Sequence, residues 1–341
     1  MKKFCFFGIL IPLIGSASAA HAGSSKDVWV VTASNATTNQ LLVYNSGGTL
    51  IQTVPTEGQG GVSGNAGGIE AQGNLVAVVN FGSLNVSTFE LGSQGFLMKQ
   101  LVPTISNPVS VAFGASHLYI LGTTQVESHR IHGSEVDRIP DGEVGLIEAD
   151  ASAAQVGVVG NQLIITEKSN MIETVNLSPG GAAIGVATPV RNIPANVNTP
   201  FGLVTRGDNA YVTIAHANEI SLVRDDAILT VVNSGTQNAP CWLTLVGPFL
   251  YSSNSPSMSV SKYAVFGQRI VQVSAVAATL NGDPTDIASG EGLVAVIDGS
   301  NGISHLSIFS VNTDGELTLL QAADTISGAA NGVAIVGEPG E

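Results

Sequence analysis

The sequence predicts an all-β fold, a seven-bladed β-propeller whose ring is closed by pairing the C-terminal strand with the N-terminal blade. Three observations lead to this prediction. A strand-and-turn motif recurs along the chain, each repeat divides into four short apolar runs, and the two ends of the chain carry complementary parts of one repeat. Four short strands in one radially placed sheet are the composition of a propeller blade.

The repeat is clearest in "NPVSVAFGASHLYILG", from Asn107, and "TPFGLVTRGDNAYVTIAHANEISLV", from Thr199. Both stretches place a Pro, an apolar run, a Gly-containing turn and a second apolar run in the same order. The motif starts again at intervals of 40 to 47 residues, near Ala66, Pro108, Ala154, Pro200, Pro240, Pro284 and Asn331. This period is longer than that of most leucine-rich or ankyrin repeats and is typical of propeller blades.

Each unit divides into four strands separated by Gly, Pro, Asn and Ser turns. In the unit that starts at Pro240 the expected strands are 243–246, 249–252, 259–266 and 269–276. Helix is expected nowhere, except for a turn or two over 143–154. A parallel β-helix is the alternative fold, but its coils are shorter and would not explain the ends of the chain.

The two ends of the chain each carry part of one blade. The opening stretch "DVWVVTASNATTNQLLVYNSGGTLIQTVPT" contains three strands and lacks a first one, whereas the closing stretch "ANGVAIVG" is a first strand alone. Six complete units and this shared seventh blade would close the ring and leave no free sheet edge between the first and last blades.

The first 22 residues read as a signal peptide. Lys2 and Lys3 precede an uncharged run over 4–14, and small residues follow up to "AHA" at 20–22. The expected organisation is therefore a signal peptide over 1–22 and a single propeller domain over 23–341, exported to the periplasm or the extracellular space. Cleavage would remove Cys5 and leave Cys241 alone, so no internal disulfide is expected.

The acidic composition of the chain limits the kinds of partner that it can bind. The chain has 12 basic and 26 acidic residues, so nucleic acid and anionic membrane surfaces are not expected partners. No later apolar stretch is long enough to span a bilayer. Only 11% of the residues are charged, which indicates strands that are buried on both faces. We expect a monomer that binds a small molecule or a protein at one face of the ring.

The chain resembles the lactonase-like seven-bladed propellers, in particular a divergent exported branch. The resemblance covers the mature chain and is carried by "NPVSVAF", "QVGVVGNQLIITEKSNMIETV", "TPFGLV", "APCWLTLVGPFLYSSNS" and "DPTDIASGEGLVAVIDGSNG". It implies the propeller fold and an activity on a lactone. In the phosphogluconolactonase-like members Arg and His follow the inner-strand Pro, whereas Val109, Phe201, Cys241 and Thr285 stand at those places here.

Candidate site residues come from the second-strand ends and the crossovers, which meet at one mouth of a propeller channel. The second-strand ends form a ring: Asn35, Asn80, Thr123, Glu167, His216, Asn254 and Asp298. The crossovers add Asn107, Thr199, Cys241, Trp242, Asp283 and Asp286.

Glu167 and His216 are the expected catalytic residues, because neither is a favoured turn residue and together they could activate a water. Asn80, Asn254, Asp298, Trp242 and Asp286 are the expected ligand-binding residues. For Asn80, Asn254 and Asp298 a role in the turns themselves is the alternative.

No metal and no cofactor are expected. His129 and His132 would point to opposite faces of a strand, and "DGSNG" at 298–302 lacks the complete calcium-loop pattern. The chain contains no serine-hydrolase elbow and no phosphate-binding Gly loop. Two functions remain open, a lactonase-like hydrolase that opens a small cyclic ester and a non-catalytic propeller that binds a ligand or a protein.

We predict that the exported protein begins at Gly23, because signal peptidases cleave after small residues arranged as in "AHA". Mass spectrometry of the protein recovered from the medium or the periplasm measures the mature terminus. Exported protein that still carries Met1 would contradict the prediction.

Overall fold

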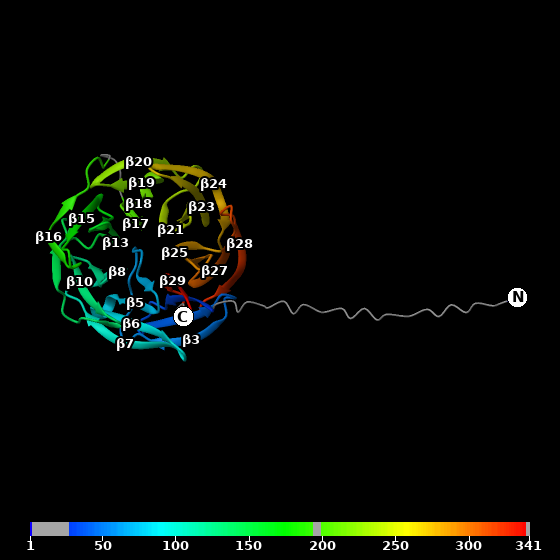
Figure 1. The fold of residues 1–341 in the computed structure, drawn as a ribbon, viewed down its shortest axis with the longest axis horizontal. Coiled ribbons are helices and arrows are strands. Elements are labelled where there is room, and N and C mark those ends of the chain that lie inside the picture. Colours follow the sequence, from blue (N-terminus) through cyan, green and yellow to red (C-terminus); the bar gives the residue numbers. More distant parts are fainter. Residues whose placement is uncertain (2–26, 194–198, 339–341) are drawn as a thin grey trace.

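The computed structural model describes residue 1, residues 27–193 and residues 199–338. The described chain forms seven β-sheets around one axis, six of four strands and one of five, and its regular secondary structure is strand except for two 3₁₀ turns (Figure 1). This confirms the predicted seven-bladed β-propeller. The predicted signal peptide and its cleavage site at 22/23 lie outside the described residues.

Six blades are continuous in sequence. Blades 1 and 2 contain β4 (Ile69–Gln72), β5 (Leu75–Asn80), β6 (Asn85–Gly92) and β7 (Gly95–Pro103), then β8 (Pro108–Phe113), β9 (His117–Gly122), β10 (Gln125–His132), β11 (Glu135–Val136) and β12 (Gly142–Gly145). Blades 3 and 4 contain β13 (Ala153–Val159), β14 (Gln162–Glu167), β15 (Met171–Leu177) and β16 (Ala183–Pro189), then β17 (Pro200–Arg206), β18 (Asn209–Ile214), β19 (Glu219–Arg224) and β20 (Ala227–Asn233).

Blades 5 and 6 contain β21 (Pro240–Val246), β22 (Phe249–Asn254), β23 (Ser259–Phe266) and β24 (Arg269–Thr279), then β25 (Asp283–Gly290), β26 (Leu293–Ser300), β27 (Ile303–Val311) and β28 (Leu317–Asp324). Blade 7 contains β29 (Asn331–Gly337), β1 (Val28–Ala33), β2 (Gln40–Asn45) and β3 (Leu50–Pro55). Two single 3₁₀ turns, η1 (Phe81–Ser83) and η2 (Ala215–Ala217), follow β5 and β18.

Blade 7 closes the ring as predicted. Strand β29 pairs antiparallel with β1, with Val31 opposite Ala334 and Val28 opposite Gly337. The last strand of the chain therefore becomes the innermost strand of a blade whose other three strands come from the opposite end of the sequence (Figure 1).

The four strands expected from Pro240 onward are confirmed in order, although β21, β22 and β24 extend a few residues further. The helical turn expected over 143–154 is wrong. Residues 142–145 form β12, which pairs with β10, and β13 begins at Ala153. Here β11 and β12 together take the place of a fourth strand, because they pair with opposite ends of β10.

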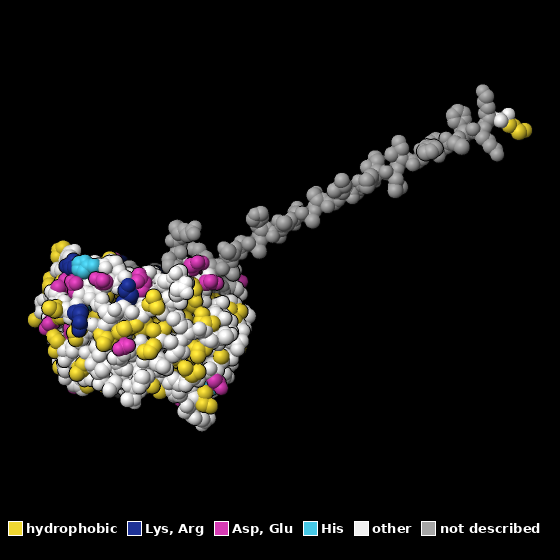
Figure 2. Space-filling model, turned by 90° about the horizontal axis from the view of Figure 1, so that it is seen from below, with side chains coloured by type: hydrophobic (Ala, Val, Ile, Leu, Met, Phe, Trp, Pro, Cys, Tyr) yellow, Lys and Arg dark blue, Asp and Glu magenta, His cyan; other side chains and the backbone are white. Residues whose placement is uncertain are grey.

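Burial changes from the axis to the rim. All six residues of β5 and of β9 are buried, as expected for strands covered on both faces. The outer strands alternate, and β3 shows the pattern plainly over Leu50–Pro55. Hydrophobic side chains are accordingly scattered over the molecular surface in Figure 2. Within the described residues no helix is long and apolar enough to cross a membrane.

Candidate functional site

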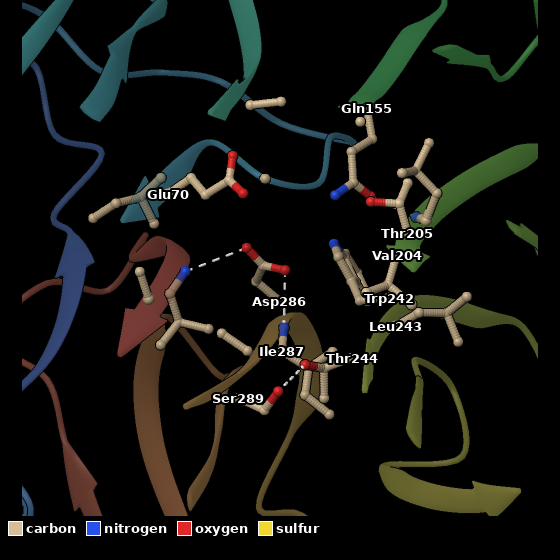
Figure 3. Close-up of a pocket in the computed structure, with 18 of the residues that line it drawn as sticks. Glu70, Gln155, Val204, Thr205, Trp242, Leu243, Thr244, Asp286, Ile287 and Ser289 are labelled. Carbon is tan, nitrogen blue, oxygen red and sulfur yellow. Dashed lines mark hydrogen bonds between the residues drawn. The ribbon is translucent and has the colours of Figure 1, made fainter. Parts of the chain in front are cut away.

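A cavity of about 560 Å³ lies on the propeller axis, and the innermost strands of all seven blades line it (Figure 3). Its walls are β4, β8, β13, β17, β21, β25 and β29. A volume of this size is typical of small-molecule sites. No single blade makes the cavity, since it exists only when the ring is closed.

Exposure shows which end of the cavity is open. Near the beginnings of the inner strands the lining residues Val111, Leu203 and Val333 are buried. Nearer the ends of β8 and β17, Phe113 is half-buried and Arg206 is exposed. The cavity therefore opens to solvent at the end where the inner strands finish.

The opposite end is covered by the Gly-rich segment 57–68, which links β3 to β4. Asn65 and Ala66 are buried within it. Asn65 O accepts a hydrogen bond from Trp242 Nε1 (3.0 Å), and Asn65 Nδ2 donates to Val109 O (2.7 Å). Asn331 Nδ2 donates to Asn65 Oδ1 (3.1 Å). The segment thus binds to the beginnings of inner strands from blades 2, 5 and 7, and we call it the axial cover.

Two carboxyl groups enter the cavity from different blades (Figure 3). Glu70 Oε2 accepts the backbone N–H of Phe113 in the next blade (3.0 Å). Asp286 accepts two backbone N–H groups, one from Ile287 (2.9 Å) and one from Val333 in the next blade (3.2 Å). Each carboxyl group therefore bridges two neighbouring inner strands.

Burial raises the pKa of both carboxyl groups toward neutrality. It raises the pKa of Glu70 to about 8 and that of Asp286 to about 7, although the backbone N–H groups lower both values in part. Asp286 is 5% exposed, and Glu70 is half-buried because water can reach it through the cavity. Protein surrounds Glu70 on every other side, so its charged form is poorly hydrated.

Gln155 completes the polar lining. Its Oε1 accepts the backbone N–H of Leu203 in the next blade (2.6 Å). Within the described chain, Gln155 Nε2 and Glu70 Oε1 have no hydrogen-bond partner, so both can bind a ligand. Figure 3 shows the Glu70 carboxyl and the Gln155 amide pointing into the cavity from opposite sides, with Asp286 between them.

Among the described residues that line the cavity, Arg206 is the only one with a cationic side chain, and it lies at the open end. Its Nη2 donates to the carbonyl oxygen of Gly247 in the next blade. The inner part of the cavity therefore offers carboxyl, amide and hydroxyl groups and no positive charge.

Two of the sequence-predicted residues, Trp242 and Asp286, line this cavity. The Trp242 ring packs edge-on against Phe201, with ring centroids 5.3 Å apart. Its indole N–H is occupied by the axial cover, so the ring offers an apolar surface to the cavity rather than a free donor.

Asn80 and Asn254 are buried at the ends of β5 and β22, and neither lines the cavity. Asn80 Oδ1 accepts from Asn39 Nδ2 (3.0 Å), and its Nδ2 donates to Ser87 Oγ (2.7 Å). Asn254 Nδ2 donates to Ser261 Oγ (2.9 Å). These amides join neighbouring strands, and a ligand-binding role for them stays a prediction.

Asp298 is buried near the end of β26 and also lies outside the cavity lining. Its Oδ1 hydrogen-bonds His305 Nδ1 (2.7 Å), while its Oδ2 has no partner among the described residues. Burial raises the pKa of Asp298, and the contact with His305 opposes that rise.

The predicted catalytic residues have different surroundings. Glu167 is fully buried, and its Oε2 accepts from Ser152 Oγ (3.0 Å). His216 is exposed in η2, and its Nδ1 contacts Thr199 Oγ1 (2.8 Å). The described residues show no hydrogen bond or ion pair between Glu167 and His216, and neither side chain lines the cavity. Their catalytic role stays a prediction.

Glu70 and Gln155 were not predicted from the sequence, because the candidates came from the second-strand ends and the crossovers and these two residues lie within first strands. The available signal was an acidic or amide residue inside an apolar first strand, in "GGIEAQ" and in "AAQVGVV". Among the described residues, no group of three or more His, Cys, Asp and Glu side chains is arranged to hold a metal ion.

No protein-family model and no curated protein sequence matches the chain. Solved structures do match the chain in their fold. A protein from Lactobacillus plantarum superposes with a TM-score of 0.67 at 14% identity, over 92% of this chain and 100% of that one. A candidate 6-phosphogluconolactonase from Bacteroides fragilis gives 0.63 at 14% identity, over 93% and 100%. The periplasmic gluconolactonase of Pseudomonas aeruginosa gives 0.65 at 14% identity, over 92% and 99%.

These similarities support the expected likeness to lactonase-like propellers at the level of the fold. At such low identity a shared propeller does not carry an activity with it, because the same fold serves many functions.

Glu167 also contacts a second buried carboxyl group, that of Glu173 on β15. This pair should make the stability of the folded protein depend on pH. Burial and the neighbouring carboxylate raise the pKa of Glu167 to about 8, and burial also raises the pKa of Glu173. The folded protein therefore favours the protonated pair, so its stability falls as pH rises from about 4.5, the value in the unfolded chain, toward about 8.

We expect Glu167→Gln to lose less stability than the wild type between pH 5 and pH 9, with a difference larger than about 1 kcal/mol, since one pKa unit corresponds to about 1.4 kcal/mol. Urea unfolding at both pH values measures this. Equal losses in the two proteins would contradict the prediction.

Proposed function

We propose that the protein is a lactonase-like hydrolase that opens a small, uncharged cyclic ester in the axial cavity. The observation that carries the proposal is the placement of two carboxyl groups, Glu70 and Asp286, in one cavity of about 560 Å³ with pKa values near neutrality. Acid and base catalysis is most effective when the pKa of the group lies near the working pH.

The two carboxyl groups suit different tasks. Asp286 accepts two backbone N–H groups, which favour its charged form and hold it in place, so it serves as the base. Glu70 accepts one backbone N–H group and has one free oxygen, so it serves as the acid. Gln155 Nε2 is the free donor for the ester carbonyl oxygen.

In the proposed reaction Asp286 takes a proton from a water molecule while the water oxygen attacks the carbonyl carbon. Gln155 Nε2 donates to the oxyanion that forms. The bond between the carbonyl carbon and the ring oxygen then breaks, and Glu70 gives its proton to that oxygen. The product is a hydroxy acid, and the two carboxyl groups regain their starting states by exchanging one proton with solvent.

Charge favours an uncharged substrate. The two carboxyl groups lie in the inner cavity, and the one cation among the described lining residues, Arg206, lies at the open end. A phosphorylated sugar would bring two negative charges against Glu70 and Asp286. The absence of Arg and His after the inner-strand Pro residues agrees with this. Gluconolactone, named for the Pseudomonas aeruginosa protein, is an uncharged lactone and a suitable test substrate.

We also propose that the chain is exported and that residues 23–341 form the working monomer. The support is the basic start at Lys2 and Lys3, the uncharged run after it and "AHA" at 20–22.

A second candidate is a propeller that binds a partner without catalysis. It is favoured by the apolar side chains that the outer strands expose, which include Ile184, Val186, Leu229, Val231, Val271 and Val273. The test below separates the two candidates.

We expect the wild type to hydrolyse glucono-1,5-lactone, and Glu70→Gln and Asp286→Asn each to lose about 10² to 10⁴ in rate, the usual effect of removing an acid or base. Turnover should rise up to about pH 7, where Asp286 ionises, and fall above about pH 8, where Glu70 ionises. Titration of the acid released measures the rate.

Glu143→Gln, at an exposed position, is the matched control and should keep the wild-type rate. Glu167→Gln and His216→Ala belong in the same panel, and loss of turnover in these two alone would return the chemistry to the residues predicted from sequence. A folded wild type that hydrolyses no uncharged lactone would contradict the hydrolase and favour the binding propeller.

A further inference from the structure

Blade 2 contains a hydrogen-bonded chain of a serine, a histidine and an aspartate that the proposed lactone chemistry does not use. Ser116 Oγ lies 2.9 Å from His117 Nδ1, and His117 Nε2 lies 2.9 Å from Asp141 Oδ2. A nucleophile, a base and a carboxylate in hydrogen-bond contact in this order are the requirement for an activated serine. Ser116 and His117 are neighbours in sequence, and Asp141 follows 24 positions after His117.

The imidazole is held in one orientation. The His117 side chain is fully buried and stacks on the Tyr119 ring, with centroids 5.9 Å apart. Asp141 accepts from Ser128 Oγ (2.9 Å) and from Arg130 Nη2 (3.1 Å). Burial acts to raise the pKa of Asp141, but the hydrogen bonds from His117 and Ser128 outweigh it and hold that pKa below its usual range.

Ionised Asp141 can only accept hydrogen bonds, so His117 carries its proton on Nε2. Its Nδ1 is then an acceptor and faces the Ser116 hydroxyl. This is the arrangement in which the imidazole can take the serine proton.

Ser116 is accessible. It lies in the three-residue turn between β8 and β9, is half-buried, and its hydroxyl is also within donating distance of Gly180 O (3.3 Å). Gly181 lies so close that a Cβ there would be 2.5 Å from His117 Nδ1 and 3.1 Å from Ser116 Oγ. Any side chain at position 181 would therefore collide with the imidazole of His117. The Arg130 guanidinium binds Asp141 (3.1 Å) and lies 3.7 Å from where a Cβ on Gly180, in the turn between β15 and β16, would stand.

We propose that Ser116, His117 and Asp141 form a second reactive site, in which Ser116 is acylated by small, uncharged esters at the surface of blade 2. Ser116 is the nucleophile, His117 is the general base and Asp141 positions His117.

The chemistry balances without any cofactor. Ser116 Oγ forms a bond to the ester carbonyl carbon, and its proton passes to His117 Nδ1. The bond from that carbon to the alcohol oxygen breaks, and the alcohol leaves with the proton from His117. Water then attacks the acyl-serine, gives one proton to His117, and the acid leaves as Ser116 regains its hydrogen.

The site is separate from the axial cavity. None of Ser116, His117, Asp141 and Arg130 lines that cavity, and none contacts Glu70 or Asp286 in the hydrogen-bond network of the described residues. Failure of the lactonase proposal would therefore leave this proposal standing, and the reverse also holds.

The test uses the full chain and a biotinylated fluorophosphonate, which reacts only with activated serines. We expect one adduct by intact mass, located on Ser116 by peptide mass spectrometry. Ser116→Ala should abolish it, and His117→Gln should slow it by about 10² to 10⁴. Asp141→Asn should also slow the labelling of Ser116. Asp141→Glu keeps the carboxylate and should label faster than Asp141→Asn, which a purely structural role of Asp141 would not produce.

Ser46→Ala changes an exposed serine in a different turn and is the matched control, so it should label at the wild-type rate. Circular dichroism checks that each variant is folded, and Ser116→Ala removes only a half-buried hydroxyl. Absence of an adduct on folded wild type, or labelling of Ser116→Ala at the wild-type rate, would overturn the proposal.

Discussion

The structure depends on how the innermost strands satisfy their backbone N–H groups. Each first strand has one neighbour in its own sheet, so its other edge faces the axis with no strand to pair with. Side chains of the preceding blade supply the missing acceptors. Glu70 binds the N–H of Phe113, Gln155 that of Leu203, and Asp286 that of Val333. The same contacts hold neighbouring blades together and place polar groups on the axis.

This constraint explains why the axial cavity has the properties of a reactive site. A carboxyl group used as an interstrand acceptor must lie where water is scarce, and burial there raises the pKa of Glu70 and Asp286 toward neutrality. Each such side chain accepts one N–H group of the next blade and still has a lone pair or an amide hydrogen to offer. The axial cover closes one end through Asn65, so a ligand must enter past Arg206 at the other.

Much of the fold could be predicted from sequence, because a blade is a local pattern repeated seven times. The regular spacing of Pro108, Pro200 and Pro284 was sufficient to predict the blades. The single strand at the end of the chain was sufficient to predict how the ring closes. The site was harder. Trp242 and Asp286 were found because crossovers lead directly to the axis. Glu70 and Gln155 were not, since their role depends on which blade follows them in space. The arrangement of Ser116 and Asp141 depends on how a split outer strand folds back.

The central claim is that a small uncharged ligand binds on the axis, between Glu70, Asp286 and Gln155. A crystal structure of Glu70→Gln, soaked with glucono-1,5-lactone, tests it most directly, because the variant should bind the lactone and turn it over slowly. The account predicts ligand density in the axial cavity, within hydrogen-bond distance of Gln155 Nε2 and the Asp286 carboxylate. Density on the opposite face beside His216, or an axial cavity that holds only water at saturating lactone, would contradict it.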